Sequence, residues 1–179
     1  MTLHADALAV LTAWAPPSDA QASLRDRYVE HLASHPDGMA KPCFPAHVTA
    51  SCLVLSADRS HVLLTLHAKA RQWFQFGGHC EASDATLAAA ALREAIEESG
   101  LPGLSLLPGP VHLDAHRVDF CHPAGPVDHL DVRYAAITSY DEPVVSDESL
   151  DVRWWPVDAL PTDEPSMLEL ITLTQEATD

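Results

Sequence analysis

Residues 77–101 carry the decisive signal and read Gly77-Gly-His-Cys-Glu-Ala-Ser-Asp-Ala-Thr-Leu-Ala-Ala-Ala-Ala-Leu-Arg-Glu-Ala-Ile-Glu-Glu-Ser-Gly-Leu101. The part from 85 to 99 is rich in alanine and contains no Pro or Gly, which predicts a helix that ends at Gly100. The glycine pair is expected to end a short aromatic strand over 73–76. A loop between the pair and the helix completes a strand–loop–helix unit.

Three glutamates, Glu94, Glu97 and Glu98, follow one another at helical spacing and therefore share one helix face. Such a trio is either a solvated helix face or a site for a cation. The glycine pair favours the second interpretation, because glycine permits the close approach of a ligand. Carboxylates together with the backbone carbonyl of Gly77 suit a hard cation such as Mg²⁺ or Mn²⁺.

This stretch resembles the Nudix box, in which a Gly, five residues, a Glu and seven residues precede Arg-Glu-apolar-any-Glu-Glu-any-Gly-apolar. Gly78 matches the opening glycine, and residues 93–101 match the closing half. The middle differs, because the loop is one residue longer and the position of the loop Glu falls on Asp84. Arg93 is expected to point away from the glutamates and to anchor the loop through Glu81 or Asp84.

The resemblance covers about residues 46–160 and implies a metal-dependent hydrolase that cleaves a phosphoanhydride bond. It implies that Glu94, Glu97 and Glu98, with the Gly77 carbonyl, bind Mg²⁺ or Mn²⁺. The expected catalytic residues are Glu94, Glu97 and Glu148, with Glu94 and Glu148 as the candidates for the general base. Nucleoside triphosphates, ADP-ribose, dinucleoside polyphosphates and nucleotide sugars share the bond, and the sequence does not choose among them.

Two alternatives stay open. A non-catalytic Nudix-like nucleotide sensor has no need to retain three mutually repelling glutamates. An isoprenyl-diphosphate isomerase requires a reactive cysteine facing the acids, and Cys80 is the only cysteine near the box.

Polar side chains alternate along two further predicted strands, at 111–120 and 129–138. If these strands pair, one polar face results. Three interpretations of this face stay open: a solvated surface, the lining of a pocket, or a second metal site. The expected substrate-binding residues are His79 in the box loop and His129, Asp131 and Arg133 on this face. Arg133 stands out because a guanidinium suits phosphate. Trp73, Trp154 and Trp155 either stack on a base or, for at least two of them, pack in the core.

The remaining pattern predicts an α/β sandwich with a mixed sheet, and the resemblance implies the Nudix-type α/β/α form of it. Strands are expected over 48–55, 61–66 and 152–156, and a terminal helix over 163–176 capped by Asp163. Helices over 3–14 and 18–34, the second capped by Ser18 in a capping box with Gln21, form an N-terminal extension. We therefore divide the chain into an extension, 1–40, packed on a main domain, 41–179.

Composition limits the partners. Ten Lys and Arg stand against 26 Asp and Glu, and the net charge of −16 disfavours a nucleic-acid polymer or an anionic membrane as partner. A small phosphorylated molecule is the expected ligand. The four cysteines form no CxxC pair and are expected to be free thiols, which places the protein in the cytoplasm. The oligomeric state is open, with a homodimer as the commonest symmetric form.

Overall fold

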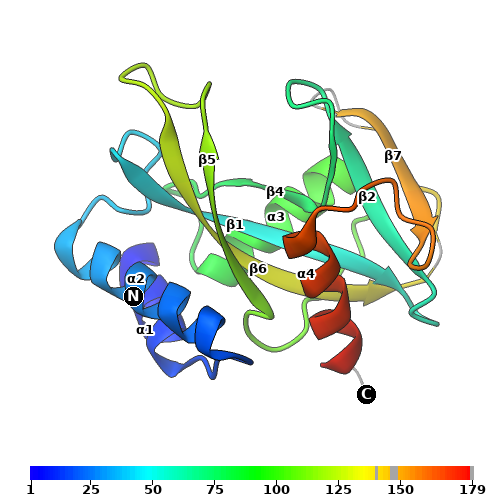
Figure 1. Cartoon of the computed structure of the whole chain (residues 1–179), viewed down its shortest axis with the longest axis horizontal. Helices are drawn as coiled ribbons and strands as arrows, with labels where there is room; N and C mark the ends of the chain where they lie inside the picture. The colour runs from blue at the N-terminus through cyan, green and yellow to red at the C-terminus, as the bar shows by residue number, and fades with distance from the viewer. Residues whose placement is uncertain (140, 146–148, 178–179) are drawn as a thin grey trace.

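The computed structural model describes residues 1–139, 141–145 and 149–177 (Figure 1). Its helices are α1 (Leu3–Ala13), α2 (Asp19–Ser34), α3 (Leu87–Ser99) and α4 (Pro165–Glu176). Its strands are β1 (Ala46–Ser56), β2 (His61–His67), β3 (Trp73–Phe74), β4 (Phe76–His79), β5 (His112–Val118), β6 (Val127–Thr138) and β7 (Ser149–Pro156).

All the strands join one mixed sheet, as the sequence predicts. The order along it is β3-β2-β1-β6-β5, with β4 paired to β1 and β7 paired to β2. The long central pair β1 and β6 runs parallel, whereas β1–β2, β1–β4, β2–β3, β2–β7 and β5–β6 are antiparallel. Strand β1 therefore forms the middle of the molecule, and it is buried along its whole length.

Strand β1 separates two apolar layers because its side chains alternate between the two faces of the sheet. Cys52 and Val54 pack with Ala95 of α3. Leu53 and Leu55 pack with helix α4 on the opposite side. The two helices thus cover opposite faces of the sheet, and the predicted α/β/α sandwich is confirmed (Figure 1).

The N-terminal helices share a core with the box helix. Tyr28 and Leu32 of α2 are buried in one cluster with Val48 of β1 and Leu87 of α3. Ser18 caps α2 as predicted, since its hydroxyl accepts the backbone N–H of Gln21. The division of the chain between residues 40 and 41 stays a prediction.

The predicted capping box is not completed, because the side chain of Gln21 is used elsewhere. It is buried and pairs with the backbone of Leu113 in β5, donating at 3.0 Å and accepting at 2.7 Å. The amide thus satisfies backbone groups at the outer strand of the sheet, where no further strand lies in the described order. This contact joins α2 to β5.

Several element boundaries differ from the sequence prediction by a few residues, and two of the differences bear on the site or have a clear cause. The glycine pair does not end a strand, because Gly77 and Gly78 continue β4 to His79, paired with Ser51 and Ala50 of β1. The terminal helix is capped by the side chain of Glu164, not by Asp163, because Pro165 stands at its first position. In the described residues, no helix is long and apolar enough to cross a membrane.

Candidate active site

The box helix α3 begins and ends as its sequence dictates. The Thr86 hydroxyl accepts the N–H of Ala89, and Gly100 ends the helix with φ of 69°, in the left-handed region that suits glycine. Its apolar residues face the sheet, with Ala91 and Ala95 fully buried. The opposite edge of the helix therefore presents the glutamates beside β4.

Glu94 lies directly against the glycine pair. A Cβ added to Gly78 would lie 2.7 Å from Glu94 Oε1 and 2.9 Å from Oε2. A side chain at position 78 would therefore displace this carboxylate, and glycine keeps the space next to its oxygens open. The Glu94 side chain is 14% exposed and Glu97 is 59% exposed, whereas Glu98 is half-buried.

Arg93 connects the loop to the glutamates. Its Nε and Nη2 donate to the two oxygens of Asp84, at 3.0 and 3.1 Å. Its Nη1 donates to Glu94 at 3.0 Å and to Glu97 at 3.1 Å. The prediction that Arg93 anchors the loop through Asp84 fits these contacts, whereas the prediction that it points away from the glutamates is wrong. Hydrogen bonds to Asp84 raise the pKa of the guanidinium, so it stays charged.

Asp84 shows how the longer loop is accommodated. Its carboxylate also accepts the backbone N–H of Glu81 at 2.8 Å, which closes a turn within the loop. Burial is the largest single influence and opposes ionisation, but the hydrogen bonds from Arg93 and the Glu81 backbone, together with the charge of Arg93, lower the pKa of Asp84. The Glu81 carboxylate accepts a hydrogen bond from Ser83 instead. The turn therefore places the shorter acid within hydrogen-bond distance of Arg93.

The predicted polar face forms, and three of its six side chains are buried. Strands β5 and β6 place His112 opposite Arg133, Asp114 opposite Asp131 and His116 opposite His129. His112, Asp131 and Arg133 are each at most 5% exposed, so this part is not a solvated surface. The sequence suggested the strand pairing, but burial depends on α4 covering this side, which only the tertiary structure shows.

Asp131 is the centre of a hydrogen-bond network. Its carboxylate accepts from Thr49 and Ser51 of β1 at 3.1 and 2.7 Å, and from Gln75 at 3.2 Å. It also accepts from Arg133 Nε at 3.0 Å. Thr49 and Ser51 were missed by the sequence analysis. The parallel register that sets them beside Asp131 and Arg133 is a long-range pairing.

Arg133 is already paired within the protein. Besides Asp131, it donates to Asp114 at 2.9 Å and to the hydroxyl of Ser166 in α4 at 3.1 Å. Its predicted contact with a substrate phosphate stays a prediction. The same holds for Asp131. Glu148, a candidate base, lies outside the described residues.

We expect the ion pair of Asp114 to make stability depend on pH. Burial alone would raise the pKa of Asp114, but hydrogen bonding to His116 and the charge of Arg133 lower this pKa to about 2. Because the carboxyl has a lower pKa in the folded state, it stabilises the fold fully at pH values above its unfolded-state pKa, near 4. This stabilisation is lost as the pH falls towards 2. The shift corresponds to about 2 kcal/mol. The free energies of unfolding of Asp114→Asn and the unaltered protein, measured with denaturant, should differ by this amount at pH 6. The difference should narrow towards pH 2. A gap that stays constant with pH would contradict this assignment.

The three tryptophans that were candidates for stacking on a base all pack against apolar layers of the protein. The rings of Trp73 and Trp155 meet edge to face at 5.2 Å, and the guanidinium of Arg153 lies 5.6 Å from each ring centre. Both rings pack against the α4 layer. Trp154 packs on the opposite layer and donates its N–H to the Asp141 carbonyl at 2.8 Å.

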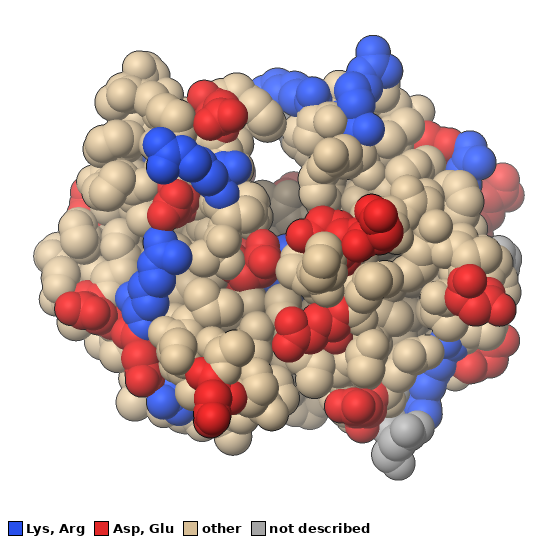
Figure 2. Space-filling model, in the orientation of Figure 1, with Lys and Arg blue, Asp and Glu red and all other residues tan. Residues whose placement is uncertain are grey.

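The molecular surface shows a hollow between the β5–β6 hairpin and the β2–β3 hairpin (Figure 2). Acidic side chains predominate over this face, in keeping with the 26 acidic and 10 basic residues of the chain. An anionic substrate approaching this face is repelled unless a cation is bound there.

Comparison with known proteins assigns the family. The model of the NUDIX domain matches residues 45–173. The chain therefore belongs to the NUDIX family, a family of hydrolases. A comparison with curated proteins gave no match.

Several solved structures share the fold. A NUDIX-family hydrolase from Clostridium perfringens is 25% identical, with a TM-score of 0.59 over 73% of this chain and 97% of that one. The dihydroneopterin triphosphate pyrophosphohydrolase of E. coli is 17% identical, with a TM-score of 0.59 over 73% and 94%. The NUDIX domain of Shewanella oneidensis NrtR, solved with ADP ribose, is 22% identical, with a TM-score of 0.57 over 84% and 97%.

Proposed function

We propose that this chain is a metal-dependent hydrolase that cleaves a phosphoanhydride bond in a nucleoside-diphosphate derivative. The observation that carries the proposal is the Glu94 carboxylate held against Gly78, with Arg93 joining it to Glu97 and to Asp84. Membership of the NUDIX family supports the reaction class. The net charge of −16 supports the need for a cation at the site.

Glu94, Glu97 and Glu98 would hold Mg²⁺ or Mn²⁺, with the Gly77 carbonyl as a further ligand. The donor set fits a hard cation because it consists of oxygens, and the absence of a Cβ at Gly78 leaves room beside the Glu94 carboxylate. Such an ion offsets the charge of a diphosphate and lowers the pKa of water. Arg93 would keep Glu94 and Glu97 in place while the loop is fixed through Asp84.

The proton acceptor is one of two glutamates. Glu94 stands in the site, and Glu148 is the second candidate outside the described residues. A carboxylate in either position would remove a proton from the attacking water as phosphorus is attacked. The products would be a nucleoside monophosphate and a phosphorylated remainder.

The isomerase alternative is disfavoured by the position of Cys80. This side chain is buried in the apolar cluster shared by α1, α2 and α3. Burial raises the pKa of its thiol to about 12, so it stays protonated and a poor nucleophile. A reactive cysteine facing the acids would require a different position.

A substrate panel tests the proposed function. The full chain is incubated with nucleoside triphosphates, ADP-ribose, a dinucleoside polyphosphate and a nucleotide sugar, with Mg²⁺, with Mn²⁺ or with EDTA, and products are separated by chromatography. We expect at least one compound to give a nucleoside monophosphate only when metal is present. Binding of these compounds without any product would instead support the sensor alternative. The homodimer and the cytoplasmic location stay predictions.

A further inference from the structure

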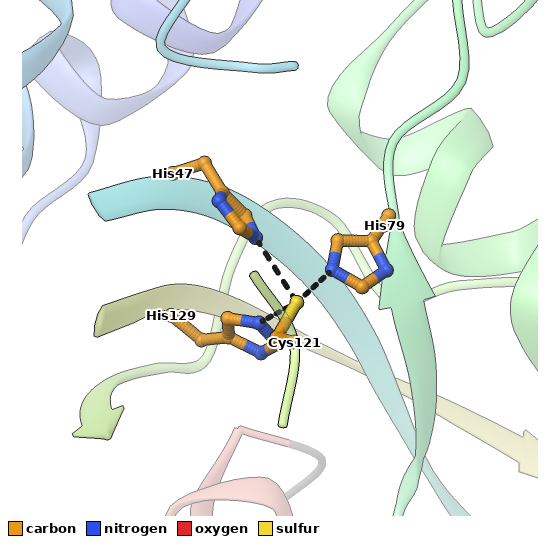
Figure 3. Close-up of side chains that lie close together, drawn as sticks. All are labelled: His47, His79, Cys121 and His129. Carbon is orange, nitrogen blue, oxygen red and sulfur yellow. Dashed lines mark hydrogen bonds between the residues drawn. The ribbon is translucent and has the colours of Figure 1, made fainter. Parts of the chain in front are cut away.

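Three histidines and a cysteine from separate parts of the chain converge on one point (Figure 3). His47 lies at the start of β1, His79 ends β4 and His129 lies in β6, while Cys121 stands in the loop between β5 and β6. One nitrogen or sulfur atom from each lies within 4.8 Å of the others. Cys121 Sγ sits among the three rings (Figure 3).

The strand register explains why these residues meet. The parallel pairing of β1 with β6 sets His47 beside His129. The antiparallel pairing of β1 with β4 sets His79 opposite Thr49, two residues along the same face of β1. The hairpin loop then brings Cys121 over the three imidazoles. The cluster is therefore a product of the sheet and not of one flexible surface segment.

The spacing of the atoms fits one tetrahedral ion. Cys121 Sγ lies 3.2 Å from His79 Nε2, 3.2 Å from His129 Nε2 and 4.0 Å from His47 Nε2. A tetrahedral zinc ion with ordinary zinc–nitrogen and zinc–sulfur bonds separates such atoms by about 3.6 Å. Two of the three sulfur–nitrogen distances are shorter than this separation and one is longer.

The hydrogen bonds around the cluster also set the tautomer of one ring. His47 Nδ1 lies 3.2 Å from the carbonyl oxygen of Cys43, to which only a protonated nitrogen can donate. In the neutral ring, Nε2 then presents its lone pair to the cluster, which is how an outer hydrogen bond orients a metal-binding histidine.

The protonation states also suit a ligand set. Burial, with the nearby Lys41 and His47, lowers the pKa of His79 to about 4. Burial and the neighbouring histidines lower the pKa of His129 to about 3. Both rings are therefore neutral near pH 7 and have a lone pair to donate. Burial raises the pKa of the Cys121 thiol, and a coordinating thiol loses its proton to the metal.

We propose that His47, His79, Cys121 and His129 bind one zinc ion, separate from the Mg²⁺ or Mn²⁺ expected at the box glutamates. Three imidazoles and a thiolate suit zinc, whereas oxygen ligands suit the harder ions. Four protein ligands close the coordination shell, as in structural zinc sites. The ion would tie the β5–β6 loop to β1 and β4, next to Gly78, and would give His79 and His129 a role other than substrate contact.

Cobalt substitution tests this site without reference to hydrolysis. The full chain is stripped of metal, titrated with Co²⁺ and followed by absorption, because only a thiolate ligand gives a near-ultraviolet charge-transfer band. We expect this band at one Co²⁺ per chain, its displacement by Zn²⁺, and its loss in Cys121→Ser. In His129→Ala we expect metal affinity to fall by at least about 100-fold, more than loss of an outer-shell partner costs.

His122→Ala is the matched control, because His122 neighbours Cys121 in the same loop but does not belong to the group. It should keep the band and the affinity. A band that is absent from the unaltered protein, or that survives in Cys121→Ser, would overturn the proposal. The box glutamates contain no sulfur, so either result would leave the proposed hydrolase function intact.

Thiol labelling gives a second test on the unaltered chain. Cys121 is half-buried, whereas Cys43, Cys52 and Cys80 are buried. Mass spectrometry after iodoacetamide treatment should show alkylation of Cys121 slowed at least tenfold by one equivalent of Zn²⁺. Equal rates of alkylation with and without Zn²⁺ would contradict coordination by this sulfur, even if the serine variant failed to fold.

Discussion

Glu97→Gln is expected to lower kcat by at least about 100-fold on the compound that the unaltered chain hydrolyses fastest. The amide oxygen of glutamine can still accept the hydrogen bond from Arg93 Nη1, which is 3.1 Å from the Glu97 carboxylate. The substitution therefore removes charge while preserving shape. Charge stabilisation by a bound metal contributes several kcal/mol to such reactions, and each 1.36 kcal/mol is a tenfold change in rate.

The measurement is steady-state kinetics at several Mn²⁺ concentrations, with thermal unfolding as a check on the fold. The Glu97 side chain is 59% exposed, so its ion pair contributes little to stability. The Tm of Glu97→Gln should therefore stay close to that of the unaltered chain. Glu30→Gln is the matched control, because it removes an equivalent charge from the exposed side of α2. Turnover unchanged in Glu97→Gln would exclude this side chain from the mechanism.

Gly77→Ala is expected to destabilise the fold by about 3 kcal/mol, at the upper end of the usual cost of overpacking a core. A Cβ at position 77 would lie 2.3 Å from Ser51 Cβ, 2.8 Å from Ser51 Cα and 3.0 Å from the Ala50 carbonyl oxygen. These atoms belong to the central strand β1, which cannot move aside as a flexible side chain can. Ser51 also donates to Asp131, so the displacement would extend into the buried network.

Denaturant unfolding measures this effect, and the Tm should fall by roughly 10 °C for a chain of this size. Gly103→Ala is the control, because an added Cβ at Gly103 meets nothing within 4 Å and the backbone there needs no left-handed conformation. If both variants kept the stability of the unaltered chain, the close packing of β4 on β1 would be contradicted.

Local pattern was enough to predict the elements and the box. The helix over 87–99 follows from its alanine content and its glycine stop, and the order of strands and helices led to the mixed sheet. The spacing of Glu94, Glu97 and Glu98 on one helix face needs only the helical repeat. Each of these features depends on residues that are near one another in the chain.

Contacts between distant segments could not be predicted in this way. The sequence offered Glu81 and Asp84 as partners for Arg93, and the fold of the loop selects Asp84. It offered Gln21 as part of a helix cap, but the side chain pairs with β5 because that strand has an edge to satisfy. In the first case two carboxylates could pair with one arginine, and in the second one amide had two possible backbone partners. The outcome depends on how the surrounding segments are arranged in space.

The sequence by itself determined the family, the strand–loop–helix unit and the acids that the unit presents, because these are set by local periodicity and glycine. Only the tertiary structure decided that His112, Asp131 and Arg133 of the polar face are buried, and that His47, His79, Cys121 and His129 meet. The physical reason is register: parallel pairing of β1 with β6 joins residues some 80 positions apart, and nothing within either strand specifies its partner.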